Sequence, residues 1–179
     1  ELRTPRVVER ARSADGVGHN LVNVFATLTR REQSELAKQF CRLVPTFNDV
    51  DVEPFNHGSQ RFRFQDRWSA DVWYTPDQVS DGTMLVLAYL CLQWQPDRPD
   101  LLAIEEPERG LHPYLMEQVV GVLREMSEGK LGGKATQIVL ATHSAELLEF
   151  VRPEEVRFLS RDPSDGSVVV ESVDTRLPT

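Results

Sequence analysis

The stretch "LLAIEEPERGLHP", residues 101–113, decides which fold this sequence predicts. It begins with four apolar residues and passes directly into two adjacent carboxylates, Glu105 and Glu106. A continuous apolar run of this length, bounded by turn-forming residues, is typical of a buried strand in a parallel sheet. Because two like charges at the end of a buried strand are costly, the pair indicates a chemical role and raises the question of what it binds.

A second strand follows the same pattern. The run "IVLAT", residues 138–142, is apolar and is followed by His143 and Ser144. A helix that begins at Pro113 is expected between the two strands, and a short helix is expected from Ser144 to Val151. This strand–helix–strand–helix order predicts a parallel sheet flanked by helices on both faces. Since ligands bind beyond the carboxyl ends of such strands, the polar strand ends are expected to converge on a ligand site.

The sequence before residue 101 divides into helices and short strands. Residues 21–28 have helical spacing, and Thr29 and Glu32 form the capping-box pattern of a second helix. The other expected elements in this part are a loop over 1–19, an antiparallel meander over 49–74 and a buried helix over 83–94. Near the C-terminus we expect a hairpin over 155–173 that turns at Asp165-Gly166. In the meander, Asp49 and Asp51 fit the solvent-facing alternation of a strand better than a metal site.

These elements predict two parts. Residues 1–95 are expected to form a helical and β-meander subdomain, and residues 96–179 an α/β lobe that ends in the hairpin. At 179 residues, with 40% hydrophobic residues, the chain can bury a sizeable core. It begins with Glu1 rather than Met, so we expect a fragment of a longer protein.

The composition and charge of the chain limit the classes of partner that it is expected to bind. The formal net charge is −8 and the pI is about 5.0, so a surface that is basic overall is excluded and any contact with DNA is expected to be local or made through other regions. No apolar run reaches the roughly 18 residues of a membrane span, and no signal peptide is visible. Cys41 and Cys91 lie in helical patterns, without metal-ligand spacing. We expect free thiols and a cytoplasmic location, with no membrane partner.

The polar strand ends suit phosphoryl transfer. A carboxylate at a strand end can hold Mg²⁺ while its neighbour orients an attacking water, and a divalent cation would relieve the repulsion within the pair. His143 could donate a hydrogen bond to a terminal phosphate. Residues 79–83, "VSDGT", form a small turn that opens into the buried helix, where backbone N–H groups and the helix dipole favour an anion. By themselves, these features also fit loop-edge carboxylates and a helix capped by Ser80 or Asp81.

In this order and spacing, the three segments resemble the ABC-type ATPase heads of the RecF, SMC and overcoming-lysogenisation-defect (OLD) superfamily. "VSDGT" is similar to the signature motif, "LLAIEEPERGLHP" to the Walker B motif and D-loop, and "LATHSAELLEFV" to the switch-histidine segment. The resemblance implies an α/β fold of the P-loop NTPase class. It also implies an ATPase that dimerises around ATP and Mg²⁺ in DNA repair, DNA metabolism or anti-phage defence.

The resemblance also implies roles for individual residues. Glu105 takes the position of the Walker B acid that binds Mg²⁺, Glu106 that of the catalytic glutamate that polarises water, and His143 that of the switch histidine at the γ-phosphate. Ser80 and Gly82 match signature residues that touch ATP held by the opposite protomer. The D-loop residues expected at the dimer interface are Arg109, Gly110, Leu111 and His112.

Four departures from the family pattern affect these expectations. Glu105 replaces the commoner Asp, Asp81 replaces a glycine and is expected to cap the helix, and His112 replaces the transporter D-loop aspartate. The fourth is that no Walker A motif occurs: "GKLGGKAT", residues 129–136, has Ala135 after Lys134 and follows a helix rather than a strand. The chain therefore matches the C-terminal lobe of a head. Its expected partner is an N-terminal Walker A lobe, without which we expect it to be inactive.

Three functions remain open on the sequence. The first is an ATP-dependent dimerising switch. The second is a metal-dependent nuclease or hydrolase that uses Glu105, Glu106, Glu108, His112 and His143. The third is a non-catalytic interaction lobe of a larger ATPase. We favour the first, because a nuclease leaves the signature-like turn unexplained and because Glu106 and His143 are both intact.

Overall fold

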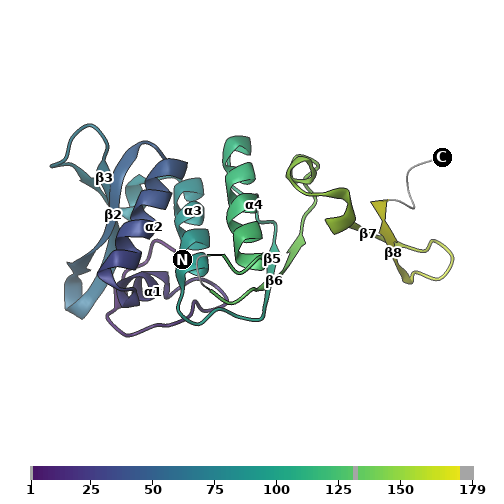
Figure 1. The fold of residues 1–179 in the computed structure, drawn as a ribbon, viewed down its shortest axis with the longest axis horizontal. Coiled ribbons are helices and arrows are strands. Elements are labelled where there is room, and N and C mark those ends of the chain that lie inside the picture. Colours follow the sequence, from purple (N-terminus) through teal and green to yellow (C-terminus); the bar gives the residue numbers. More distant parts are fainter. Residues whose placement is uncertain (1, 131–132, 174–179) are drawn as a thin grey trace.

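The computed structural model describes residues 2–130 and 133–173. Two parts follow one another along the long axis, with helix α3 between α2 and α4 (Figure 1). The helices are α1 (Leu21–Thr27), α2 (Arg30–Leu43), α3 (Asp81–Trp94) and α4 (Pro113–Ser127). The strands are β1 (Arg6–Val7), β2 (Phe47–Phe55), β3 (Ser59–Asp66), β4 (Trp73–Tyr74), β5 (Leu101–Glu105), β6 (Gln137–Ala141), β7 (Arg157–Arg161) and β8 (Val168–Ser172).

The predicted meander is confirmed. Strands β2 and β3 pair antiparallel from Phe47↔Asp66 to Phe55↔Ser59, and β4 adds to β3. The expectation that residues 1–19 form only a loop is wrong at one point, because Arg6 and Val7 pair with the other edge of β3. A two-residue strand in a polar segment carries no alternation, so its pairing depends on the neighbouring strand rather than on its own sequence.

Helix α2 begins as the sequence predicts. The Thr29 side chain accepts a hydrogen bond from the Glu32 backbone N–H, and the Glu32 carboxylate accepts one from the Thr29 N–H at 2.8 Å. The buried face of α2 packs on the meander through aromatic rings. Phe40 lies with its ring centroid 5.9 Å from Phe47 and 5.7 Å from Phe64. This aromatic cluster fixes the helix on one face of the sheet.

Helix α3 is buried on nearly all sides, as its apolar sequence predicts. It packs between α2 and α4, and its fully buried residues include Val86, Leu87, Leu90 and Cys91. A helix with no polar face suits a central position, because every side meets protein. The N-terminus of α3 is thereby held against the loop that follows β5.

Strands β5 and β6 pair in parallel, as predicted, with Glu105 opposite Ala141. Their alternate residues Leu102, Ile104, Ile138 and Leu140 pack against the core on the side of α4. The opposite face is exposed, with Leu101 at 55% and Val139 at 49% of full accessibility. The expectation of strands buried on both faces is therefore wrong for the described chain, because only one face has helices against it.

The segment after β6 differs from its prediction. The short helix expected over 144–151 is present as a shorter 3₁₀ helix, Leu147–Phe150, in which Leu147 is the buried residue. The antiparallel hairpin β7–β8 is confirmed and projects from the rest of the chain (Figure 1). Gly166 has φ of 75°, a conformation that glycine adopts without strain, and lies in the predicted turn.

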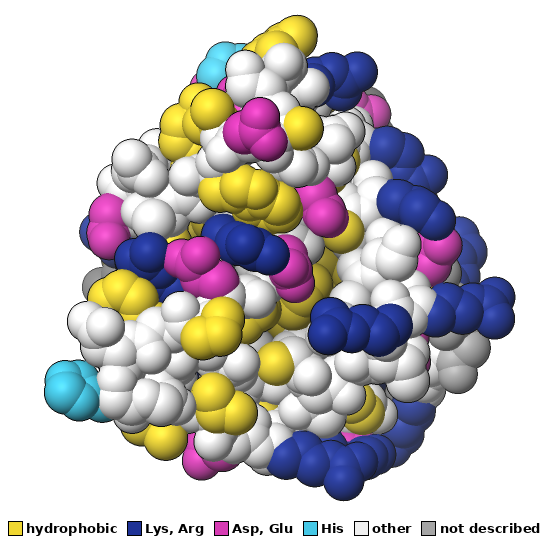
Figure 2. Space-filling model, turned by 90° about the vertical axis from the view of Figure 1, so that its left-hand side faces the viewer, with side chains coloured by type: hydrophobic (Ala, Val, Ile, Leu, Met, Phe, Trp, Pro, Cys, Tyr) yellow, Lys and Arg dark blue, Asp and Glu magenta, His cyan; other side chains and the backbone are white. Residues whose placement is uncertain are grey.

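The outer face of the meander is polar and contains paired charges. Arg61 contacts Glu53 at 2.7 Å, and Arg63 contacts Asp51 at 2.8 Å. Asp51 is therefore part of an ion pair across the strands, as the solvent-facing interpretation predicts. Figure 2 shows this end of the molecule, with Lys and Arg side chains concentrated along one side. The chain's net negative charge is thus unevenly distributed.

No helix in the described ranges, 2–130 and 133–173, is both long and apolar enough to cross a membrane.

Candidate functional site

The two polar strand ends converge, as predicted. Glu105 closes β5 opposite Ala141, and the Glu106 backbone N–H donates to the Ala141 carbonyl at 2.7 Å. A second link joins the loops beyond the strands, where the Thr142 hydroxyl donates to the Glu108 carboxylate at 2.5 Å. The loop after β5 and the loop after β6 therefore form one connected surface at the carboxyl edge of the sheet.

Glu106 has an unusual backbone conformation. Its φ is 47°, in the left-handed region that residues with a Cβ rarely occupy. The turn is closed by the Arg109 N–H, which donates to the Glu106 carbonyl at 3.0 Å. The Glu106 side chain is 42% exposed, and its carboxylate lies 3.8 Å from the Arg109 guanidinium. Such strain is typical of residues whose side chain must point in one direction for function.

Glu105 lies on the uncovered face of the sheet, where its side chain is exposed. A carboxylate oxygen at a strand end is a suitable ligand for Mg²⁺, which usually also binds water and phosphate oxygens. The exposed position of Glu105 fits that role, since the ion keeps several waters. His143 is also exposed and follows directly after Thr142.

The signature-like turn at residues 79–83 caps α3. The Ser80 hydroxyl accepts a hydrogen bond from the Thr83 N–H at 3.1 Å, so Ser80 is the N-cap. The expectation that Asp81 caps the helix is wrong. Asp81 is instead the first helical residue, and its exposed carboxylate pairs with Arg3, whose guanidinium also donates to the Val79 carbonyl at 2.9 Å. No local pattern indicates this role for Arg3, because it lies 78 residues away from its partner.

The predicted D-loop packs directly on this turn. A Cβ on Gly82 would come within 2.9 Å of the Gly110 carbonyl oxygen, and Gly110 has φ of 81°. Arg109 is exposed, whereas the Leu111 side chain is buried in the chain's own core. His112 caps α4, its Nδ1 accepting from the Tyr114 N–H at 3.3 Å. The D-loop thus has Arg109 and backbone on its surface, while Leu111 anchors it.

Across residues 2–130 and 133–173, no group of three His, Cys, Asp or Glu side chains is placed to hold a metal ion. Lys134, in the segment that resembles a P-loop in composition, pairs with Asp100. The described ranges contain two cysteines, and both are free, with Cys91 buried and Cys41 half-buried.

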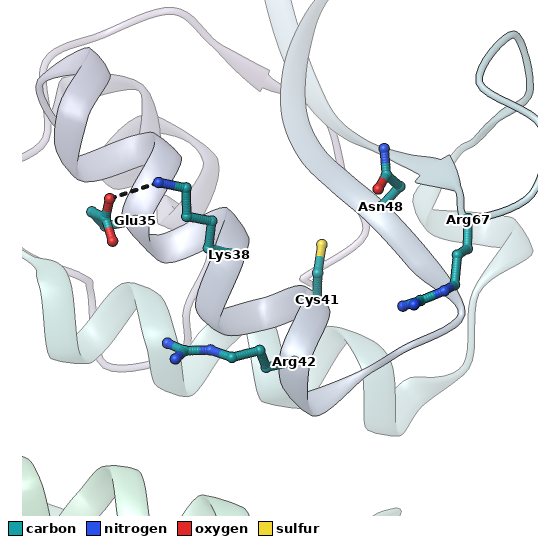
Figure 3. Close-up of a pocket in the computed structure, with 6 residues that line it drawn as sticks. All are labelled: Glu35, Lys38, Cys41, Arg42, Asn48 and Arg67. Carbon is teal, nitrogen blue, oxygen red and sulfur yellow. Dashed lines mark hydrogen bonds and ion pairs between the residues drawn. The ribbon is translucent and has the colours of Figure 1, made fainter.

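Among the described residues, a hollow lies away from the strand ends. It lies between α2 and the meander, and Figure 3 shows the six side chains that line it: Glu35, Lys38, Cys41, Arg42, Asn48 and Arg67. Lys38 is paired with Glu35 at 2.9 Å, and burial, together with Asp49, raises the pKa of Cys41 to about 11. None of the residues predicted for the site lines this hollow. Glu105, Arg109 and His143 are exposed, so the candidate site is an open edge of the sheet.

Known proteins share this architecture. The family described as "AAA domain, putative AbiEii toxin, Type IV TA system" matches residues 6–149. No curated protein matches the chain. Among solved structures, an SMC ATPase from a study of ATP-driven dimerisation and DNA-stimulated activation has a TM-score of 0.57 and 15% identity, covering 84% of this chain and 88% of that one.

Two further structures are similar. An Smc head bound to the C-terminal winged-helix domain of ScpA has a TM-score of 0.62 and 15% identity over 97% of this chain. An Smc head domain with an extended coiled coil, from Pyrococcus furiosus, has a TM-score of 0.54 and 14% identity over 80% of it. The chain spans 53% and 35% of these two structures.

The mixed α/β architecture, with its parallel pair of strands β5 and β6, agrees with these likenesses. The fold is that of an ABC-type ATPase head of the SMC kind, within the P-loop NTPase class. The match over residues 6–149 shows that the chain belongs to the AAA domain family described as "AAA domain, putative AbiEii toxin, Type IV TA system".

Proposed function

We propose that this chain is the C-terminal lobe of a head that binds and hydrolyses ATP with Mg²⁺. One observation supports this most strongly: Glu105 ends β5 and Glu106 follows it, beside the strand that leads to His143. In this proposal Glu105 holds Mg²⁺, Glu106 polarises the attacking water and His143 donates to the γ-phosphate. The φ of 47° at Glu106 supports a constrained carboxylate.

We further propose that two heads close around ATP. Ser80 and Gly82 would contact ATP bound to the opposite protomer, and Arg109, Gly110, Leu111 and His112 would form the segment that meets it. The close approach of Gly82 to the Gly110 carbonyl supports this, because it makes the signature turn and the D-loop parts of one surface. The Leu111 side chain would contribute by anchoring the D-loop rather than by touching the opposite protomer, since it is buried in the core of this chain.

The proposed partner of this lobe is a Walker A lobe. The uncovered face of β5–β6 supports the proposal, because Leu101 and Val139 would remain in water without a covering element. Apolar side chains on a parallel sheet are ordinarily buried on both faces. That lobe would also supply the phosphate-binding loop that a complete nucleotide site requires.

The biological role that we propose is inferred from the family to which the chain belongs. We propose a role in DNA repair, DNA metabolism or anti-phage defence of the OLD type, and the family's description as a toxin of a type IV toxin–antitoxin system favours defence. One similar structure is described in terms of DNA-stimulated activation, and we propose DNA as a partner through other regions. Two free thiols fit a reducing cytoplasm.

The test is Mg²⁺-dependent ATP turnover by the full-length protein with Glu106→Gln. The variant keeps the shape of the side chain but cannot polarise water, so kcat is expected to fall by about 10²-fold or more while ATP-bound dimers accumulate. Glu117→Gln, on the exposed side of α4, is the matched control and should behave as wild type. Unchanged turnover and assembly in Glu106→Gln would leave the non-catalytic interaction lobe as the better account.

A further inference from the structure

A chain of hydrogen bonds runs from the loop after β5 into the turn that carries His143. The Glu108 carboxylate accepts from the Thr142 hydroxyl at 2.5 Å, and the Thr142 oxygen accepts from the Ser144 N–H at 2.9 Å. Next, the Ser144 hydroxyl accepts from the N–H of buried Leu147 at 3.3 Å. His143 lies between Thr142 and Ser144, which these hydrogen bonds hold. The backbone position of His143 therefore depends on the hydrogen bonds.

The direction of these hydrogen bonds is determined. The Thr142 hydroxyl has one proton, and its oxygen already accepts from a backbone N–H. The hydroxyl donates this proton to the Glu108 carboxylate at 2.5 Å, and hydrogen bonds to a carboxylate are of the stronger and shorter kind. A neutral side chain without an acceptor at position 108 would leave the Thr142 proton without this partner.

The residue before Glu108, Pro107, is held by helix α3. The Tyr89 hydroxyl of α3 donates to the Pro107 carbonyl at 3.1 Å. Burial, together with the Glu108 charge, raises the pKa of Tyr89 to about 12. The second oxygen of the half-buried Glu108 carboxylate is buried and has no hydrogen-bond partner among the described residues. An unsatisfied buried oxygen is unfavourable, so packing alone gives no reason for a carboxylate at this position.

We propose that Glu108 is a positioning residue that sets the His143 turn relative to Glu106, using Thr142 as its contact. The inference rests on the proposed ATP hydrolysis and adds a residue to it. In this role Glu108 acts through Thr142 rather than on the nucleotide or the attacking water. It fixes the loop with the proposed catalytic glutamate to the loop with the proposed switch histidine, and Tyr89 ties the signature helix to the same junction.

The experiment uses the full-length protein and four variants: Thr142→Val, Thr142→Ser, Glu108→Ala, and Glu108→Ala combined with Thr142→Val. Valine keeps the branched shape but removes the hydroxyl, whereas serine keeps the hydroxyl. We expect kcat to fall about 10-fold or more in Thr142→Val with a KM for ATP within about 2-fold of wild type, since misplacing a reacting group affects turnover most. Thr142→Ser should recover most of the activity, and the double variant should be no slower than the worse single variant.

A second readout does not depend on hydrolysis. Amide hydrogen exchange of Ser144 in the nucleotide-free protein should be about 10-fold faster or more in Thr142→Val and in Glu108→Ala, and near wild type in Thr142→Ser. Thr136→Val is the matched control, because Thr136 is a buried threonine that donates to the Pro99 carbonyl at 2.9 Å beyond the other end of β6. It should lower the melting temperature but leave Ser144 exchange and kcat unchanged.

The outcomes separate the inference from the function on which it rests. Normal kcat and normal Ser144 exchange in Thr142→Val, in a protein that hydrolyses ATP, would overturn the positioning role and leave the proposed function intact. Additive losses in the double variant would also overturn it, because the two residues would then act independently. A wild-type protein without ATP turnover would overturn the proposed function, and with it the positioning role.

Discussion

The Gly110 carbonyl oxygen lies against Gly82, so close that a Cβ at position 82 would be 2.9 Å away from it. This contact joins the N-terminus of α3 to the loop after β5. Because the obstructing atom belongs to the backbone, Gly82→Ala must shift the D-loop, and we expect a loss of about 1–3 kcal/mol in the free energy of unfolding. Denaturant unfolding measures this. Gly121→Ala is the control, because Gly121 lies on the exposed face of α4 and a Cβ there meets nothing within 4 Å. This variant should gain up to about 1 kcal/mol in the free energy of unfolding. Equal effects in the two variants would show that the Gly82 contact is not tight.

Glu106→Gly is expected to stabilise the protein while it abolishes turnover. A non-glycine residue in the left-handed region costs about 1–2 kcal/mol, and the greater freedom of glycine in the unfolded chain offsets about half of that. The expected gain in the free energy of unfolding is therefore about 0.5–1 kcal/mol, measured by chemical denaturation. Glu106→Gln retains the Cβ and should show no gain. A loss of stability in the glycine variant would mean that Glu106 is held favourably, without strain.

Glu155 is expected to hold the C-terminal hairpin in a pH-dependent way. Hydrogen bonds from Arg124 and Arg152 lower its pKa from 4.5 to about 2. Since the pKa is lowered on folding, the stabilisation is present above about pH 4.5 and is lost as the pH falls toward 2. The carboxylate is one-third exposed, so we expect only about 1 kcal/mol. In Glu155→Gln, exchange across β7–β8 should be faster at pH 7 and depend less on acid. Glu154→Gln, a more exposed neighbour, should change little, and equal effects of the two variants would contradict the assignment.

Val139 tests whether another element covers the open face of β5–β6. If a Walker A lobe packs there in the full-length protein, Val139→Lys buries an unpaired charge and should lower stability by about 2–3 kcal/mol or more. Val168→Lys, on β8, replaces a valine that is 60% exposed and should change stability by less than about 0.5 kcal/mol. Thermal unfolding and ATP turnover provide the comparison. Equal tolerance of both lysines would show that the face stays in water.

The fold could be predicted wherever local patterns are strong. The capping box at Thr29 and Glu32 set the start of α2, the apolar run over 83–94 predicted a central helix, and the strands that end at Glu105 and Ala141 were recognisable from their continuous apolar runs. Each of these signals is complete within a few residues. The short strand β1 was missed, because its pairing depends on a strand more than 50 residues away. The short helix predicted over 144–151 is present only as the 3₁₀ helix Leu147–Phe150.

The candidate site likewise has features that local sequence patterns predict and features that only the packing of distant segments determines. The sequence by itself determined which residues stand at the strand ends, since strand and turn signals place Glu105, Glu106 and His143 along the chain. Only the tertiary structure decided that Arg3 pairs with Asp81 and that Gly82 meets Gly110. These contacts join residues 28 to 78 positions apart, and they depend on how helices and strands pack. A local pattern contains no information about which distant backbone will arrive beside it, whereas the packed core fixes that choice for all segments together.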